Sequence, residues 1–228
     1  MPGPVKRVLR TVRLALTAWA RRAPGWPPPG SDLVGYEVLV KFIRRHGLHR
    51  LPGDFVEIGA FLGGGTYKLA RLARECGKLV WVVDIFDPSF DTTQNLAGFR
   101  MCELYQRHLA GRSQECIFYE VNKKNLEYLR VLKSDSKQVK FPAGVRFAFG
   151  FIDGNHDPAY VENDFYLVWE KLVPGGAVGF HDYKGDLPQV TAKIEELIRR
   201  ERLNIAGVVE IPAKWIVLLI KKGHGSEP

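Results

Sequence analysis

Cysteine is scarce in this chain, and the few that occur form no pattern of ligands or disulfides. Cys76, Cys102 and Cys116 are the only three in 228 residues, and none belongs to a CxxC pair. A disulfide scaffold needs many paired cysteines, and a structural zinc site needs clustered ones. The sequence therefore argues against both classes and predicts reduced thiols.

Long apolar runs are also lacking. No stretch reaches the roughly 18 apolar residues that suggest a membrane-spanning helix, and arginines interrupt the only candidate core of a secretory signal. There are no internal repeats and no low-complexity segments. A hydrophobic content of 46% with five tryptophans is typical of a folded core. We therefore expect one sizeable cytoplasmic domain.

Acidic residues are absent from residues 1–31, which carry six of the eight net positive charges. Only two remain for residues 32–228, so the body of the chain is not predicted to bind nucleic acid. Apolar residues recur at helical spacing between residues 5 and 22 and predict a basic amphipathic helix. The proline-rich residues 23–30 end it. We divide the chain into this helix and linker, residues 1–30, and a domain over 31–228.

Three roles are open for the basic helix. It could pack on the domain or on a second subunit of a homo-oligomer, lie on an anionic membrane surface, or serve as a mitochondrial targeting segment. We favour packing, because amphipathic helices most often bury their apolar stripe against protein.

From residue 54 onward, apolar segments alternate with segments of helical periodicity. Predicted strands cover residues 54–60, 78–86, 115–121, 144–154, 176–183, 205–211 and 214–222. Predicted helices cover residues 65–77, 95–111, 122–133, 157–174 and 189–203. Strands that are apolar throughout are typical of parallel sheets with helices on both faces. The pattern predicts an α/β fold with an open, doubly wound sheet, closed by an antiparallel pair.

Ligands of such sheets bind at the carboxyl ends of the strands. Polar residues and glycines gather at these ends in this sequence. They are Glu57 and Gly59 after the first strand, Asp84 after the second, Asp153 after the fourth, and His181 with Asp182 after the fifth. We expect the functional site to lie along this edge.

A glycine-rich loop follows the first strand, with glycines at 59, 63, 64 and 65. Phe61 breaks the GxGxxG pattern, so the loop is either a tight turn or a cradle for a ligand. Asp84 lies 19 residues after Gly65, where a carboxylate accepts ribose hydroxyls. Together they indicate a nucleoside-bearing cofactor, and the charge of Glu57 favours a cationic one.

A second cluster follows the fourth and fifth strands. Ends of adjacent parallel strands lie about 4.8 Å apart, so Asp153, His181 and Asp182 can share a divalent cation with nearby Asn155. His156 or His181 is a candidate general base. The alternatives are helix caps for the aspartates and an exposed loop position for His156.

The motifs FVEIGAFLGGGT, WVVDIFD, FIDGNH and GFHDY resemble those of the class I S-adenosylmethionine-dependent methyltransferases. The similarity covers roughly residues 32–222. It is greatest to the subgroup of macrolide-sugar, aminocoumarin-sugar and rhamnosyl O-methyltransferases. The resemblance implies a Rossmann-like sheet of seven strands with the last strand antiparallel.

The resemblance also implies residue roles. The cofactor would contact Glu57, Gly59, Ala60, Phe61, Gly63, Gly65, Thr66, Asp84 and Asp153. Asp153, His181 and Asp182 would hold Mg²⁺ or another divalent cation. Asn155 stands where some sugar methyltransferases carry a catalytic acid, so the base would pass to His156 or His181. Pro158 replaces a frequent tyrosine, whose contact would be lost or pass to Tyr160.

These observations predict an O-methyltransferase that uses S-adenosylmethionine and a divalent metal to methylate a hydroxyl of a small molecule or sugar. Residues 86–95 and 184–189 are expected to shape the acceptor pocket. The alternatives are a nicotinamide-dependent oxidoreductase, which the missing GxGxxG disfavours, and a non-catalytic protein that keeps the fold.

Overall fold

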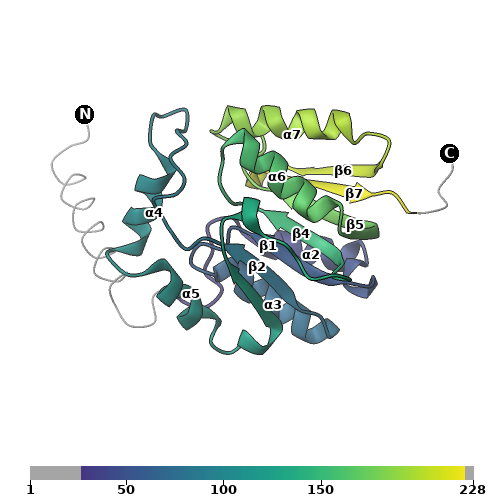
Figure 1. Ribbon diagram of the computed structural model, residues 1–228, viewed down its shortest axis with the longest axis horizontal. Helices are drawn as coiled ribbons and strands as arrows, with labels where there is room; N and C mark the ends of the chain where they lie inside the picture. Colours follow the sequence, from purple (N-terminus) through teal and green to yellow (C-terminus); the bar gives the residue numbers. More distant parts are fainter. Residues whose placement is uncertain (1–26, 224–228) are drawn as a thin grey trace.

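A seven-stranded sheet in the order β3-β2-β1-β4-β5-β7-β6 forms the centre of the computed structural model, which describes residues 27–223 (Figure 1). The strands are β1 Asp54–Ile58, β2 Val80–Asp84, β3 Leu129–Lys133, β4 Phe147–Ile152, β5 Leu172–Phe180, β6 Ile205–Ile211 and β7 Ile216–Lys221. The first five are parallel, and β7 runs antiparallel between β5 and β6. The predicted seven-stranded sheet with an antiparallel last strand is confirmed.

Helices cover both faces of the sheet. They are α2 Glu37–Arg45, α3 Gly64–Cys76, α4 Met101–Leu109, α5 Gln114–Asn122, α6 Pro158–Trp169 and α7 Pro188–Arg200. Short 3-10 turns are η1 Leu48–Arg50, η2 Leu126–Tyr128, η3 Ser136–Gln138 and η4 Pro212–Lys214. The phenylalanines of β4 are divided between the two faces: Phe149 and Phe151 join the core under α2 and α3, and Phe147, beyond a register irregularity, joins the core under α6 and α7. This double cover explains why the strand is apolar throughout.

Several predicted boundaries are confirmed by their end signals. Helix α3 ends at Gly77, which takes the left-handed conformation, as glycine does at no steric cost. Helix α6 begins at Pro158, and the side chain of Asp157 accepts a hydrogen bond from the backbone N–H of Ala159 at 2.8 Å. A carboxylate cap followed by proline is a strong start signal.

The predicted third strand and the helix after it were wrong. Residues 115–121 form most of α5, where Ile117, Phe118 and Val121 are buried on one helical face. The third strand is β3, inside the segment that helical periodicity assigned to a helix. It is an edge strand whose Arg130 and Lys133 are exposed, so it lacks the continuous apolar run that marks the inner strands.

The boundary between α6 and β5 was also placed too late. The helix ends at Trp169, and β5 begins at Leu172, which pairs with Phe147 of β4. Pro174 and Gly175 therefore lie inside the strand, next to an irregularity in its register. Such a bulge tolerates a proline that would not fit a regular inner strand.

The predicted basic helix at residues 5–22 lies outside the described residues, so its packing, membrane and targeting roles stay predictions. Within residues 27–223, no helix is long and apolar enough to cross a membrane.

Candidate functional site

A cavity of about 420 Å³ opens where the strand order reverses, between the carboxyl ends of β1 and β4. Ligands of open α/β sheets bind at this reversal. The glycine-rich loop after β1 lines one wall, and the ends of β4 and β5 line another. The structure therefore brings the two predicted clusters to one cavity.

The glycines of the loop are required by contacts with protein. A Cβ atom at Gly59 would lie 2.1 Å from the backbone oxygen of Asp153, and one at Gly64 would lie 1.9 Å from that of Ser31. One at Gly65 would lie 2.4 Å from the ring of Tyr36. The tight-turn alternative is thus the one that explains these glycines, and the turn places the backbone of residues 59–62 along the cavity.

Asp84 holds the glycine-rich loop against the end of β2 through hydrogen bonds. Its Oδ2 accepts hydrogen bonds from the backbone N–H groups of Ala60 at 2.8 Å and Phe61 at 3.0 Å. Its Oδ1 accepts from Phe86 N–H at 2.6 Å and from Gln114 Nε2 at 3.2 Å. Burial raises the pKa of Asp84, and these donors oppose the rise. A carboxylate has about four lone-pair sites, so a ribose hydroxyl would have to replace one donor, and Gln114 is the longest.

Glu57 lies beneath the loop and is fully buried. The hydroxyl of Thr66 donates to its Oε2, whereas its Oε1 has no partner within hydrogen-bond distance. Burial raises the pKa of Glu57 to about 8, and hydrogen bonding with Thr66 and Tyr36 opposes the rise. Glu57, Gly63 and Thr66 do not themselves line the cavity, so they support the loop from below.

This burial predicts a pH-dependent stability. A carboxyl whose folded-state pKa is raised stabilises the fold fully below its ordinary pKa, and the stabilisation is lost as pH rises toward about 8. We expect the free energy of unfolding to fall by about 3–4 kcal/mol between about pH 5 and pH 8 from this group alone. Glu57→Gln removes most of that fall, measured by urea unfolding at both pH values.

Glu127→Gln, at an exposed position, serves as the matched control and should leave the slope unchanged. An equal fall in the Glu57→Gln variant and the parent chain would show that Glu57 does not titrate in this window.

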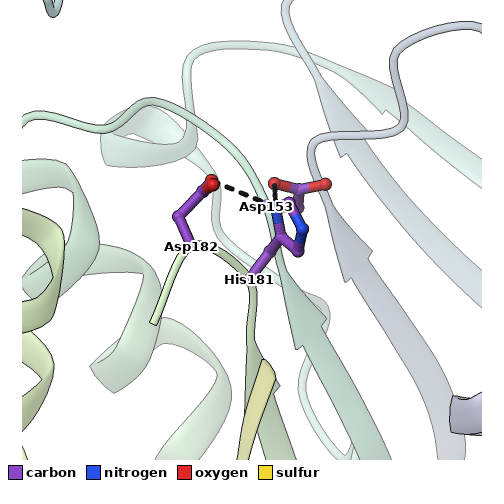
Figure 2. Close-up of side chains that lie close together, drawn as sticks. All are labelled: Asp153, His181 and Asp182. Atoms are coloured by element: carbon purple, nitrogen blue, oxygen red, sulfur yellow. Dashed lines mark ion pairs between the residues drawn. The ribbon is translucent and has the colours of Figure 1, made fainter. Parts of the chain in front are cut away.

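A chain of ionisable side chains crosses the opposite wall. Asp91 Oδ2 lies 2.5 Å from His156 Nδ1, and His156 Nε2 lies 2.8 Å from Asp182 Oδ2. The same Asp182 oxygen lies 3.1 Å from His181 Nδ1, which lies 3.2 Å from Asp153 Oδ1 (Figure 2). All five groups line the cavity. Asp182 thus joins two imidazoles, one from the loop after β4 and one from the end of β5.

The electrostatics of this chain follow from its pairing. Burial alone would lower the pKa of His156, but its hydrogen bonds to Asp182 and Asp91 raise it to about 10. Burial would likewise lower the pKa of His181, and Asp153 and Asp182 raise it to about 10. The pKa of Asp182 is held well below its usual range by both imidazoles, against the effect of burial. At neutral pH, negatively charged carboxylates and positively charged imidazoles therefore alternate along the cluster.

The three predicted metal ligands come together. Asp153, His181 and Asp182 each offer an atom, and these atoms lie within 4.8 Å of one another. Figure 2 shows both carboxylates paired with the same nitrogen of the His181 ring. Asp182 takes a left-handed backbone conformation with φ of +58°, which costs a non-glycine residue on the order of 1 kcal/mol. Such strain concentrates at functional sites.

Two features of the site were not predicted: the contact of Asp91, which lies in the predicted acceptor loop 86–95, with His156, and the lining of the cavity by residues 134–136. Asp91 belongs to the loop after β2, 65 residues before its partner His156, and no local signal connects them. Residues 134–136 follow β3 and line the cavity. The rule of strand ends would have found them had β3 been placed correctly.

The predicted acceptor loops lie along the cavity and touch one another. Asp87, Phe90, Asp91 and Asn95 line it from the first loop, and Asp186 lines it from the second. The backbone N–H of Leu96 donates to the oxygen of Asp186 at 2.9 Å, and Asn95 Nδ2 donates to its carboxylate at 3.0 Å. The hydroxyl of Tyr160 lines the same space and donates to Asp135 at 3.1 Å.

Comparison with known proteins agrees with this arrangement. A protein family described as a methyltransferase domain matches residues 56–183. The sequence matches none of the curated proteins significantly.

Solved structures share the fold. The O-methyltransferase NovP is 21% identical, with a TM-score of 0.65 over 82% of this chain and 79% of that one. The calicheamicin methyltransferase CalS11 is 13% identical, with a TM-score of 0.57 over 96% and 94% of the two chains. A Podospora anserina methyltransferase, PaMTH1, solved with S-adenosylhomocysteine, is 12% identical, with a TM-score of 0.55 over 97% of each chain.

The family match spans more than half of the chain and includes the glycine-rich loop, Asp84 and the cluster at the ends of β4 and β5. The chain therefore belongs to the family of methyltransferase domains, and the predicted membership of the S-adenosylmethionine-dependent methyltransferases is confirmed.

Proposed function

We propose that this chain transfers a methyl group from S-adenosylmethionine to a hydroxyl of a small molecule or sugar, with a divalent cation bound at the cluster. The observation that carries the proposal is the convergence of Asp153, His181 and Asp182 in the same cavity as the glycine-rich loop. Solved relatives that share the fold include an O-methyltransferase and a TDP-rhamnose 3'-O-methyltransferase.

The residues around the glycine-rich loop fit a cationic nucleoside cofactor. The backbone of Gly59, Ala60 and Phe61 borders the cavity. Asp84, at the end of the neighbouring strand, faces the same space. Beneath them, Glu57 is buried and largely protonated at neutral pH, so the negative charge that favours a sulfonium and an ammonium over a pyrophosphate comes from the aspartates that line the cavity. We assign these residues, with Gly63, Gly65 and Thr66 as support, to the cofactor.

The cluster also fits a divalent cation. Two carboxylates and one imidazole are the donor set expected for Mg²⁺, Mn²⁺ or Fe²⁺. Asp153, His181 and Asp182 would hold the ion, which would bind acceptor hydroxyls and lower their pKa. Asp153 borders both the loop and the cluster, because its backbone oxygen contacts Gly59.

The reaction is a displacement at carbon. An oxygen lone pair of the acceptor forms the new O–C bond, the C–S bond breaks, and S-adenosylhomocysteine leaves. The acceptor proton passes to a base, for which His156 and His181 are the candidates. Asp91 orients His156 through Nδ1, as carboxylates commonly orient catalytic imidazoles. Both His156 nitrogens are paired here, and its raised pKa leaves the ring protonated at neutral pH. His156 would therefore act as a base only after its contact with Asp182 opens and the ring loses a proton.

Cofactor binding gives the test. We expect S-adenosylhomocysteine at about a hundred times its Kd to stabilise the protein by about 2.7 kcal/mol, a rise in Tm of roughly 5–10 °C. Differential scanning fluorimetry measures the shift. Reduced nicotinamide dinucleotide at the same concentration is the control and should give none. A shift with the dinucleotide alone would overturn the proposal in favour of an oxidoreductase.

A further inference from the structure

The cavity is unusually rich in carboxylates. Nine aspartates and three histidines line it, and no lysine or arginine of residues 27–223 does. The two imidazoles of the cluster, His156 and His181, offset only part of that charge, since three of the nine aspartates surround them. One further lining carboxylate, Asp164, is 1% exposed and has an unpartnered Oδ2. Clefts lined by one sign of charge concentrate ligands of the other sign and repel those of the same sign.

Apolar side chains also line the cavity. They include Leu33, Phe90, Met101 and Leu104. Leu33 is 67% exposed and offers apolar surface to a ligand of the cavity. An acceptor that binds here buries apolar surface, and this burial contributes favourably to the free energy of binding.

Trp215 lies beside the cluster. Its indole is 44% exposed, lines the cavity and lies 6.4 Å from the His181 ring between centroids. Its backbone has a left-handed φ of +52°, a cost that an ordinary turn residue such as glycine would avoid. A Cβ at Gly185 would lie 3.0 Å from the indole, so the loop after β5 supports the ring closely.

We propose, on the basis of the methyl transfer proposed above, that the acceptor carries no negative charge and stacks an apolar ring face on Trp215. Lys68 pairs with Asp32, and the imidazoles and the proposed cation offset the carboxylates of the cluster. The remaining carboxylates repel acceptors linked to a phosphate or nucleotide, because no lysine or arginine of residues 27–223 lines the cavity to bind such a group. Aromatic stacking on one side and the oxygen donors of Asp153 and Asp182 on the other select a ring that bears adjacent hydroxyls. Trp215 is thus assigned as a specificity-determining residue.

Three probes that differ only in charge test this selection. Hydroxytyrosol is neutral, dopamine is cationic and 3,4-dihydroxyphenylacetate is anionic, and all three share one dihydroxyphenyl ring. Their Kd values are measured by calorimetry on the full chain saturated with S-adenosylhomocysteine. We expect the anion to bind at least about tenfold more weakly than the neutral probe, equal to about 1.4 kcal/mol. The gap should shrink with added salt, because screening weakens interactions between exposed charges.

Substitutions at Trp215 test the stacking. Trp215→Gly relieves the backbone strain, so the variant is expected to fold, and should weaken all three probes by about fivefold to tenfold. Trp215→Phe should restore most of that loss, whereas the Kd of S-adenosylhomocysteine should not change. Tyr119→Ala, which removes an aromatic ring of similar exposure outside the cavity, is the matched control and should bind all probes normally.

The outcomes separate the two proposals. Equal or tighter binding of the anion, or of TDP-rhamnose over the neutral probe, overturns the charge selection even when S-adenosylhomocysteine binds. Unchanged probe binding in Trp215→Gly overturns the stacking. Probe binding in the expected order by a chain that does not bind S-adenosylhomocysteine or S-adenosylmethionine overturns the proposed methyl transfer and leaves the charge selection standing.

Discussion

Asp182→Ala should lower kcat for methyl transfer by about 10³-fold and leave the binding of S-adenosylhomocysteine nearly unchanged. Among residues 27–223, Asp182 is the one group that contacts both imidazoles, through the same carboxylate oxygen, and it is a candidate metal ligand. Its loss removes a donor from the cation and frees both imidazoles to move. Three measurements check this: turnover of labelled S-adenosylmethionine, Mn²⁺ affinity by calorimetry, and the Tm shift with the demethylated cofactor.

Two further variants keep the result interpretable. Removing a buried carboxylate leaves paired charges without a partner and destabilises the protein, so Asp182→Asn retains the shape and one oxygen. Asp157→Asn is the matched control, because asparagine caps a helix as well as aspartate does and Asp157 does not line the main cavity. Full turnover in Asp182→Asn, with Mn²⁺ affinity unchanged, would show that the carboxylate has no part in the reaction.

The core of this cluster could be predicted from sequence for a simple reason. Asp153 and the pair His181 and Asp182 each follow an apolar strand, and these two strands are consecutive in the chain and adjacent in the sheet. In parallel sheets, that adjacency places strand ends together. Asp91 could not be found in this way. It lies in an irregular loop, and its contact with His156 depends on how that loop folds over the sheet.

The misplaced third strand had a direct consequence for the prediction of site residues. Residues 115–121 are apolar enough for a strand, but their burial follows a helical face, and the true β3 carries exposed charges at the sheet edge. Local pattern therefore favoured the wrong segment, and tertiary position decided the right one. Because strand ends were used to find ligand contacts, the error hid Ser134, Asp135 and Ser136, which line the cavity.

The glycine-rich loop shows a different limit. Its spacing predicted a sharp turn, and the left-handed φ values of Gly59 and Gly63 confirm it. Sequence alone could not show what approaches the glycines. The neighbours are the backbone of Asp153 at Gly59 and the Phe118 ring with Asn122 at Gly63. Protein atoms occupy the positions that side chains at these two residues would fill. This packing fixes the backbone of the loop, and the backbone forms the surface that faces the ligand.

Gly59→Ala should therefore destabilise the protein by about 2–4 kcal/mol. A left-handed backbone costs alanine on the order of 1 kcal/mol, and φ at Gly59 is +84°. The new methyl group would also lie 2.1 Å from the Asp153 oxygen, and overpacking against backbone costs a further 1–3 kcal/mol or more. Urea unfolding at one pH measures the change, and Mn²⁺ calorimetry shows whether Asp153 has moved.

Gly144→Ala separates the two costs. Gly144 has nearly the same φ, +82°, but a Cβ there meets nothing within 4 Å, so we expect a loss of only about 1 kcal/mol and normal Mn²⁺ affinity. The difference between the two variants measures the contact between the loop and the end of β4. Equal losses would mean that the loop yields to the methyl group, and that the glycine-rich loop and the cluster are not held together by this packing.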